Sequence, residues 1–200
     1  MRNNIIQHIR KFIDLNEIEA VTINKYIEIH QYKKKEFIIQ ERKVCKHLYF
    51  VEKGCLRMYF INKKGVEQIT QFALDGWWIS DYQSFMNNTL SDYYIQTIEE
   101  STVVSINNQN LDKLLIELPR LEKYFRIIMQ KAVAGAQHRS KLLYEMSKEE
   151  FYFHFSASFP EFMLRVPQYM IASYLGLTPE YLSELRKKIY NTNFLNQFNF

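Results

Sequence analysis

Residues 167–188 read PQYMIASYLGLTPEYLSELRKK, a pattern of two short helices joined by a tight turn. Ala172 supplies the small side chain that two steeply crossing helices need where they touch. Gly176 comes four positions later and tolerates the positive φ of a sharp turn. Thr178 and Pro179 suit the N-cap and the first position of a second helix. The stretch therefore predicts a helix-turn-helix.

An ordinary helical hairpin is the alternative, because Ala, Gly and Leu are common and their spacing alone discriminates poorly. The N-cap and the basic cluster at residues 186–188 favour the helix-turn-helix. Leu182 and Leu185 are spaced to return to the core that the two helices share. The second helix of such a motif enters the major groove of DNA, so this segment is a candidate nucleic-acid interface.

The composition is that of a folded globular chain with one large or two small domains. Of its 200 residues 47% are hydrophobic and 16% aromatic, and four Pro and five Gly leave little room for a flexible linker. The formal net charge of +4 is compatible with a nucleic-acid partner but does not indicate one alone.

The cysteines and apolar segments favour neither a metal cofactor nor a membrane. Cys45 and Cys55, the only cysteines, supply neither a disulfide framework nor four thiolates for an iron–sulfur cluster, and we expect no cluster and no haem. No apolar run approaches the roughly 20 residues of a membrane span. Ile5 and Ile9 alternate with charged residues as in an amphipathic helix, unlike a signal peptide. We expect a cytoplasmic protein without a metal or a membrane partner.

The order of the elements predicts an α+β chain. Residues 1–27 are expected to be helical, with Asn16 and Glu19 as a capping pair, and a strand-rich region begins near Glu28. The clearest strands are residues 48–51, 56–61, 68–72 and 102–106. Short strands at this spacing predict an antiparallel β-roll of the jelly-roll type. Ser147 and Glu150 form a second capping pair beyond a long helix.

Three segments follow from this order. They are a β-roll domain with N-terminal helices (residues 1–118), a long helix (residues 119–146) and a helical reading domain (residues 147–200).

A heptad stripe along the long helix indicates a dimer interface. Its members, spaced alternately by four and three, are Leu121, Phe125, Ile128, Ala132, Gly135, Arg139, Leu142 and Met146. The small residues at its centre would let two backbones approach closely. The alternative is that the stripe packs only on the chain's own sheet. We favour a helix that serves both surfaces, with one face on the roll and the seam on a second copy.

With this order in place, the chain resembles the Crp/Fnr-type bacterial transcription regulators. These join a β-roll of the cyclic-nucleotide-binding type, through a dimerisation helix, to a winged-helix DNA-binding domain. The most specific matches are residues 48–57 (LYFVEKGCLR) and 166–188. The resemblance implies a homodimer that places two reading helices in successive major grooves, roughly 34 Å apart, on double-stranded operator DNA. RNA polymerase is a further expected partner.

The resemblance assigns roles to residues of the reading domain. Gln168 and Tyr169 match positions that touch backbone phosphate. The face turned to the bases carries Thr178, Pro179, Glu180, Ser183 and Glu184. Arginines that read guanine commonly stand at the positions of Pro179 and Glu184, so this operator should differ from the family's best-known one.

Arg186 and Lys187 lie further along this helix. They could contact phosphate, or they could form a solvated basic helix end, which the helix dipole favours. Residues 191–200 leave little chain for a full wing.

The roll lacks the residues that hold a cyclic phosphate. Ser80-Asp81 stands where the family has Gly-Glu, and Ser91-Asp92 stands where it has its arginine. Residues 69–109 contain no Lys or Arg, and a buried phosphate without a cation is strongly disfavoured. We therefore predict no tight binding of cyclic AMP.

Aromatic and polar side chains in the same region could line a site for another small-molecule effector, or simply close the core. The effector-pocket candidates are Trp77, Trp78, Asp81, Tyr82, Ser91, Asp92 and Tyr94, with Phe85 and Tyr93 beside them.

The leading hypothesis is a dimeric, sequence-specific DNA-binding regulator. The alternative is a small-molecule-sensing β-roll whose helical tail mediates protein contacts without reading DNA. We expect no enzyme, because the five histidines are scattered and none belongs to a nucleophile or metal motif.

Overall fold

The computed structural model describes residues 4–196 and confirms the predicted α+β architecture. Its elements are α1 (Asn4–Arg10), α2 (Glu17–Asn24), β1 (Glu28–Tyr32), β2 (Phe37–Ile39), β3 (His47–Lys53), β4 (Leu56–Ile61), β5 (Glu67–Ala73), β6 (Trp78–Ile79), α3 (Tyr82–Asn87), β7 (Tyr94–Thr97), β8 (Ser101–Asn107), α4 (Asn108–Glu117), α5 (Leu121–Glu145), α6 (Lys148–Ser158), α7 (Pro160–Arg165), α8 (Gln168–Leu175) and α9 (Pro179–Asn196). Helices α3 and α7 were not predicted from the sequence.

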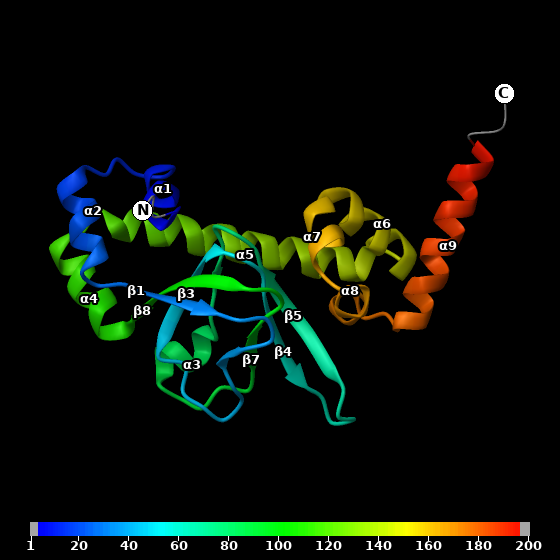
Figure 1. Cartoon of the computed structure of the whole chain (residues 1–200), viewed down its shortest axis with the longest axis horizontal. Coiled ribbons are helices and arrows are strands. Elements are labelled where there is room, and N and C mark those ends of the chain that lie inside the picture. Colours follow the sequence, from blue (N-terminus) through cyan, green and yellow to red (C-terminus); the bar gives the residue numbers. More distant parts are fainter. Residues whose placement is uncertain (1–3, 197–200) are drawn as a thin grey trace.

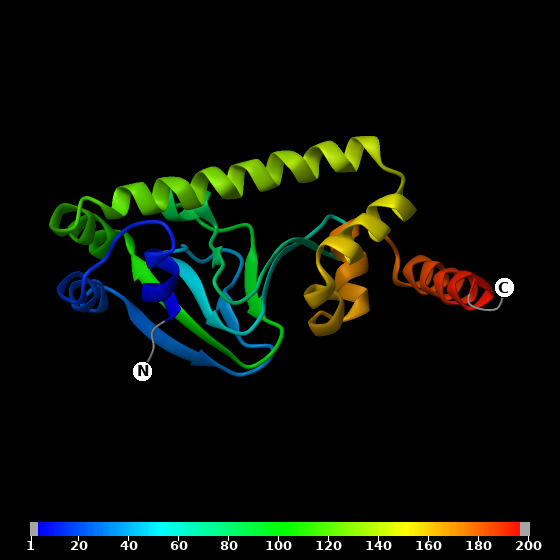
Figure 2. The same ribbon diagram turned by 90° about the horizontal axis from the view of Figure 1, so that it is seen from above.

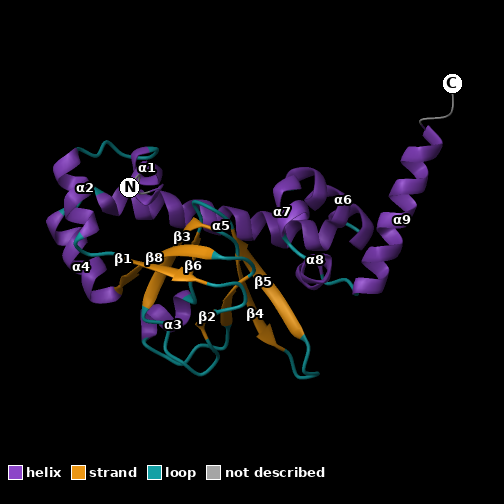
Figure 3. Ribbon diagram, viewed as in Figure 1, coloured by secondary structure: helices purple, strands orange, loops and turns teal. Residues whose placement is uncertain are grey.

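Two antiparallel four-stranded sheets form the β-roll, in the orders β1-β8-β3-β6 and β2-β7-β4-β5 (Figure 3). Tyr49 faces Ser105 across β3 and β8, and Arg57 faces Gln96 across β4 and β7. The interior between the sheets is filled by buried side chains from both of them: Ile39, Cys45, Tyr49, Val51, Leu56, Ala73, Ile79, Ile95 and Val103. The roll is therefore a packed core.

The outer face of the first sheet packs against the N-terminal helices, α4 and the start of α5. At its centre the hydroxyl of Tyr124 accepts a hydrogen bond from Trp78 Nε1 at 2.8 Å and lies 2.9 Å from His8 Nδ1. Tyr124 is fully buried, and Phe50 packs on Trp78. Burial on this face holds α5 along the roll.

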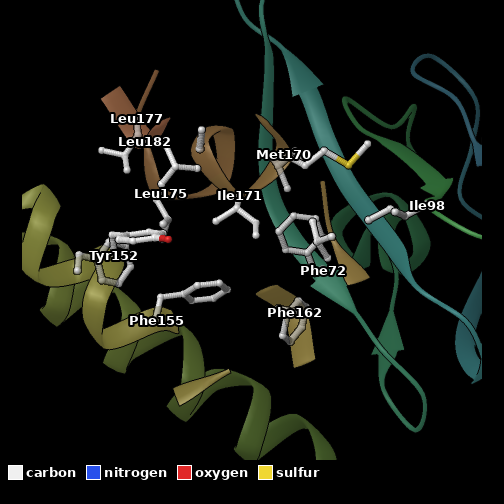
Figure 4. Packing of buried hydrophobic residues seen from close by; sticks show 14 of the residues in the cluster. Phe72, Ile98, Tyr152, Phe155, Phe162, Met170, Ile171, Leu175, Leu177 and Leu182 are labelled. Carbon is white, nitrogen blue, oxygen red and sulfur yellow. The ribbon is translucent and has the colours of Figure 1, made fainter. Parts of the chain in front are cut away.

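The outer face of the second sheet packs against helices α6–α9, which we call the reader. Their shared hydrophobic cluster, the docking cluster, comprises Cys55, Tyr59, Ile69, Phe72, Leu74, Ile98, Leu142, Phe151, Tyr152, Phe155, Phe162, Val166, Met170, Ile171, Ala172, Leu175, Leu177, Leu182 and Leu185. Figure 4 shows Phe72 of β5 facing Phe162 and Ile171 of the reader. The reader therefore rests on the roll rather than hanging from a free linker.

Helix α5 runs along the molecule from the end where α2 and α4 lie to the reader, and α9 projects at the far end (Figures 1 and 2). Both predicted capping boxes are present, at Asn16 with Glu19 and at Ser147 with Glu150. Within residues 4–196 no strand follows β8, so the wing implied by the resemblance is absent from that part of the chain. No described helix is long and apolar enough to cross a membrane.

Candidate nucleic-acid interface

Helices α8 and α9 form the predicted helix-turn-helix. Gly176 ends α8 in the left-handed region, with φ 70° and ψ 30°, and its N–H donates to the carbonyls of Ala172 and Ser173. The N–H of Leu177 also donates to the Ala172 carbonyl, at 2.9 Å. Thr178 Oγ1 accepts from the N–H of Tyr181 at 3.2 Å, as an N-cap does. The turn chemistry read from the sequence thus agrees with the geometry.

Helix α9 has a buried side and an exposed side. Leu182 and Leu185 are buried in the docking cluster. The five residues expected to face bases, Thr178, Pro179, Glu180, Ser183 and Glu184, are all exposed. The buried leucines therefore hold the helix in place, while the polar residues on its other side stay accessible, as a reading helix requires.

The charges on the exposed side are mixed. Glu180, Ser183, Glu184 and Lys187 share one face because they stand at positions i, i+3, i+4 and i+7. Arg186 is exposed but lies on the flank. Burial raises the pKa of the Tyr152 hydroxyl, and the charge of Arg186 only partly offsets this rise. The carboxylates can accept hydrogen bonds from cytosine amines, and the cations can contact phosphate.

The two candidate phosphate-contacting residues at the start of α8 differ in exposure. Tyr169 is 51% exposed. Gln168 is half-buried, and its Oε1 atom is buried without a hydrogen-bond partner among the described residues. Only Tyr169 therefore presents its side chain freely.

Ser173 ties α8 to the edge strand of the second sheet. Its hydroxyl donates to the carbonyl of Glu67 at 2.8 Å and accepts from the N–H of Ile69 at 3.1 Å. Gln68 Nε2 also donates to the Ser173 carbonyl, at 2.5 Å. The first helix of the motif thus occupies backbone groups that an edge strand leaves unpaired.

Arg139 joins α5 to both domains. Its guanidinium donates to the carbonyl of Thr70 in β5 at 3.0 Å and to that of Tyr174 in α8 at 2.7 Å. It also lies 4.0 Å from the centre of the Tyr174 ring. One arginine in the predicted dimer seam therefore fastens the reader of its own chain.

Arg165, at the end of α7, makes a third polar link between reader and roll. Nη1 bonds Asp75 at 3.2 Å and Glu161 at 2.6 Å, and Nη2 bonds Glu99 at 2.5 Å and the Gly54 carbonyl at 2.8 Å. Burial lowers the pKa of Arg165, but its hydrogen bonds to the three carboxylates outweigh burial and raise that pKa.

The sequence reasoning missed the roles of Arg165 and Ser173, and Arg139 was assigned to a different contact. Nothing local marks the roles of Arg165 and Ser173 in docking, because their partners in the roll lie 66 to 111 positions away.

The predicted dimer seam mostly packs within one chain. Leu121, Phe125 and Ile128 join the cluster under the N-terminal helices, while Leu142 and Met146 join the docking cluster. These side chains, like the hydrogen-bonded Arg139, already make contacts within the chain. Ala132 and Gly135 remain exposed. The chain's own core therefore covers part of the predicted seam, and its contact with a second copy stays a prediction.

The effector-pocket candidates do not surround one cavity. Asp81 caps α3 through Oδ1, and its Oδ2 accepts from the Ser91 hydroxyl at 2.7 Å. Trp78 faces outward onto α5, and Tyr94 stacks on Tyr59 beside the docking cluster.

Of the remaining candidates, Tyr82 packs against the cluster beneath the N-terminal helices, and burial raises its pKa to about 12. Asp92 is exposed, and Trp77 lies near α7. Phe85 and Tyr93 are half-buried. The candidates therefore lie at several separate places, some buried in the roll and some on its surface.

No group of three or more His, Cys, Asp or Glu side chains within the described part of the chain is arranged to hold a metal ion. Both cysteines are buried, and burial raises the pKa of each thiol. Burial thus favours the neutral form of each thiol.

Comparison with known proteins agrees with this geometry. Residues 29–117 match the family described as "Cyclic nucleotide-binding domain". The chain is 30% identical over 196 residues to the fumarate and nitrate reduction regulatory protein of Yersinia pestis, covering 91% of this chain and 77% of that protein. It is 28% identical over 194 residues to the anaerobic regulatory protein of Pasteurella multocida, covering 91% and 70% of the two chains.

Solved structures share the fold. FixK2 of Bradyrhizobium japonicum has a TM-score of 0.71 at 20% identity, covering 84% of this chain and 86% of its own. The regulator CLP of Xanthomonas campestris has a TM-score of 0.71 at 14% identity, covering 89% and 93%. The chain belongs to the Crp/Fnr family of bacterial transcriptional regulators.

Proposed function

We propose that this regulator binds double-stranded DNA in a sequence-specific manner as a homodimer. The observation that carries the proposal is the exposed row on α9, from Thr178 to Glu184, backed by the buried Leu182 and Leu185. A helix held rigidly from behind can present side chains to base edges without reorganising. The relatives' names describe regulators, which supports the same role.

We propose that the dimer interface lies on a second stripe of α5, next to the predicted seam on the helix surface. Met129, Val133, Ala136, Ser140 and Leu143 are again spaced by four and three, so they share a face. Val133 is 57% exposed and Leu143 is 50% exposed, which is costly for aliphatic side chains in a free monomer. Two such stripes could pack together with small residues at their centre.

The roll of this regulator is proposed to work without cyclic AMP. The hydrogen bond between Asp81 and Ser91 joins the two positions that hold a cyclic nucleotide in the family's nucleotide-binding members. Neither side chain supplies the positive charge that a buried phosphate needs, and residues 69–109 contain no Lys or Arg. We further propose that the protein acts in the cytoplasm and meets RNA polymerase on promoter DNA.

Selection of bound fragments from random duplex DNA, at two salt concentrations, tests the DNA-binding role. We expect an enriched inverted repeat with half-sites about 10 base pairs apart. The double variant R186E/K187E should lose affinity and reduce the salt slope by about 4, because two phosphate contacts disappear from each of the two subunits.

The control K33E/K34E makes the same charge change at exposed positions after β1, and should bind like the wild type. An absent motif, or equal losses in both double variants, would contradict a sequence-reading role for α9 and favour a tail that contacts proteins.

A further inference from the structure

A cavity of about 340 Å³ lies where the reader meets the roll. Asp75 and Trp77 line it from the turn between β5 and β6, and Phe159, Glu161 and Phe162 line it from α7 and the residue before it. Its volume falls within the range of about 300–1,000 Å³ typical of small-molecule sites. Because both domains contribute walls, anything bound there touches both.

Three aromatic rings make one side of this junction cavity. Trp77 and Phe159 each pack edge-on against Phe162, with ring centres 5.8 Å apart. Trp77 is nevertheless 43% exposed and Phe159 39% exposed. Rings that the core does not cover leave apolar surface that a flat ligand can bury.

The polar side of the cavity is negative. Arg165 carries one positive charge against the three carboxylates of Asp75, Glu99 and Glu161, so the bonded cluster has a net charge of −2. Both terminal nitrogens of Arg165 are already engaged, so it cannot serve as a free anchor for an anion.

We propose that the junction cavity is a binding site for a small aromatic amine. Its ring would cover the exposed faces of Trp77 and Phe159, and its ammonium group would lie toward Glu161 and Asp75. Glu161 bonds Arg165 through Oε1, which leaves Oε2 able to accept from the ligand. A cation beside an exposed indole gains further attraction from the ring. An anion of the same shape meets net negative charge and is rejected.

This site is separate from Asp81 and Ser91 in the roll, the positions that match those holding a cyclic nucleotide in the family's nucleotide-binding members. A ligand that bridges roll and reader stabilises their docked arrangement by mass action. An effect of this ligand on operator binding rests on the proposed function. Binding of the ligand to the junction cavity does not depend on that function.

Isothermal titration calorimetry without DNA tests the site, with tryptamine as the probe and indole-3-propionate as its anionic counterpart. We expect saturable tryptamine binding with a dissociation constant below about 1 mM and no measurable binding of the propionate. Trp77→Ala should weaken tryptamine binding about tenfold or more.

Glu161→Gln keeps the shape of the side chain and should also weaken tryptamine binding, so the test survives if Trp77→Ala fails to fold. Leu164→Ala is the matched control, since Leu164 is exposed on the same helix but does not line the cavity. Absent tryptamine binding, equal binding of both indoles, or binding unchanged in Trp77→Ala and Glu161→Gln would overturn the proposal. None of these outcomes bears on whether α9 reads DNA.

Discussion

His8 shows how one buried side chain makes the fold sensitive to acid. It lies against Phe50 and Tyr124, and its Nδ1 atom is 2.9 Å from the Tyr124 hydroxyl. Burial, followed by the charges of Lys11 and Lys131, lowers the pKa of His8 to about 4 from its ordinary 6.5. The folded chain therefore keeps this imidazole neutral at a pH where the unfolded chain has bound a proton.

The sign of the pH dependence follows from this difference. Because the unfolded state binds the proton first, the free energy of unfolding falls as the pH drops from about 6.5 toward 4. Between pH 7 and pH 5.5 His8 should contribute a loss of about 1 kcal/mol. Urea unfolding at both pH values should show this loss shrinking in His8→Gln. His138→Gln, at an exposed position of α5, should keep the wild-type loss; equal losses in all three chains would refute the assignment.

Asp81 and Ser91 decide whether the roll can take a cyclic nucleotide. Their side chains are buried and bonded to each other at 2.7 Å, and Asp81 also caps α3. Calorimetry with cyclic AMP should give no binding heat up to about 1 mM ligand, because a buried phosphate without a cation is strongly disfavoured. A saturable isotherm in the micromolar range would contradict this prediction.

At the scale of the element, α5 carries two apolar stripes. One packs beneath the N-terminal helices and in the docking cluster, and the other, containing Val133 and Leu143, faces outward. Val133→Glu should shift the dimer toward monomers in sedimentation equilibrium, since two carboxylates would meet across a desolvated interface.

Ala134→Glu is the matched control for the α5 interface. It places the same charge on the next residue, which helical geometry turns about 100° away from Val133. Ala134 is exposed, so we expect its variant to remain dimeric. Dissociation by both variants, or by neither, would argue against the outward stripe as the interface.

At the scale of the whole molecule, the reader is docked on the roll through apolar packing and three polar links, at Ser173, Arg139 and Arg165. Ser173→Ala removes the hydroxyl that pairs with Glu67 and Ile69 on the edge strand. The free energy of unfolding should fall by about 1 kcal/mol, because lost hydrogen bonds outweigh the better helix propensity of Ala.

Hydrogen exchange gives the docking prediction a site-specific readout. The amide of Ile69 should exchange faster in Ser173→Ala than in the wild type, since it loses its acceptor. Ser183→Ala, exposed on α9, makes the same chemical change and should neither lower stability nor speed the exchange of that amide. Unchanged exchange of Ile69 in Ser173→Ala would mean that the docked contact is not formed in solution.

Local chemistry was readable from the residues themselves. The αL position of Gly176, the caps at Asn16, Ser147 and Thr178, and the strand at residues 56–61 all follow from interactions within a few positions. The resemblance at residues 166–188 then pointed to the exposed face of α9.

Tertiary packing decided what neighbouring residues could not. Two stripes of α5 have heptad spacing, and only the position of the roll and reader determines which stripe is covered. Ser173 forms a hydrogen bond with Glu67, which lies 106 positions away in the sequence, and Arg165 forms one with Asp75, 90 positions away. Such pairings depend on how surfaces from distant segments come together, and no periodicity along the chain encodes them. The junction cavity has the same origin, because its walls belong to two separately folded surfaces.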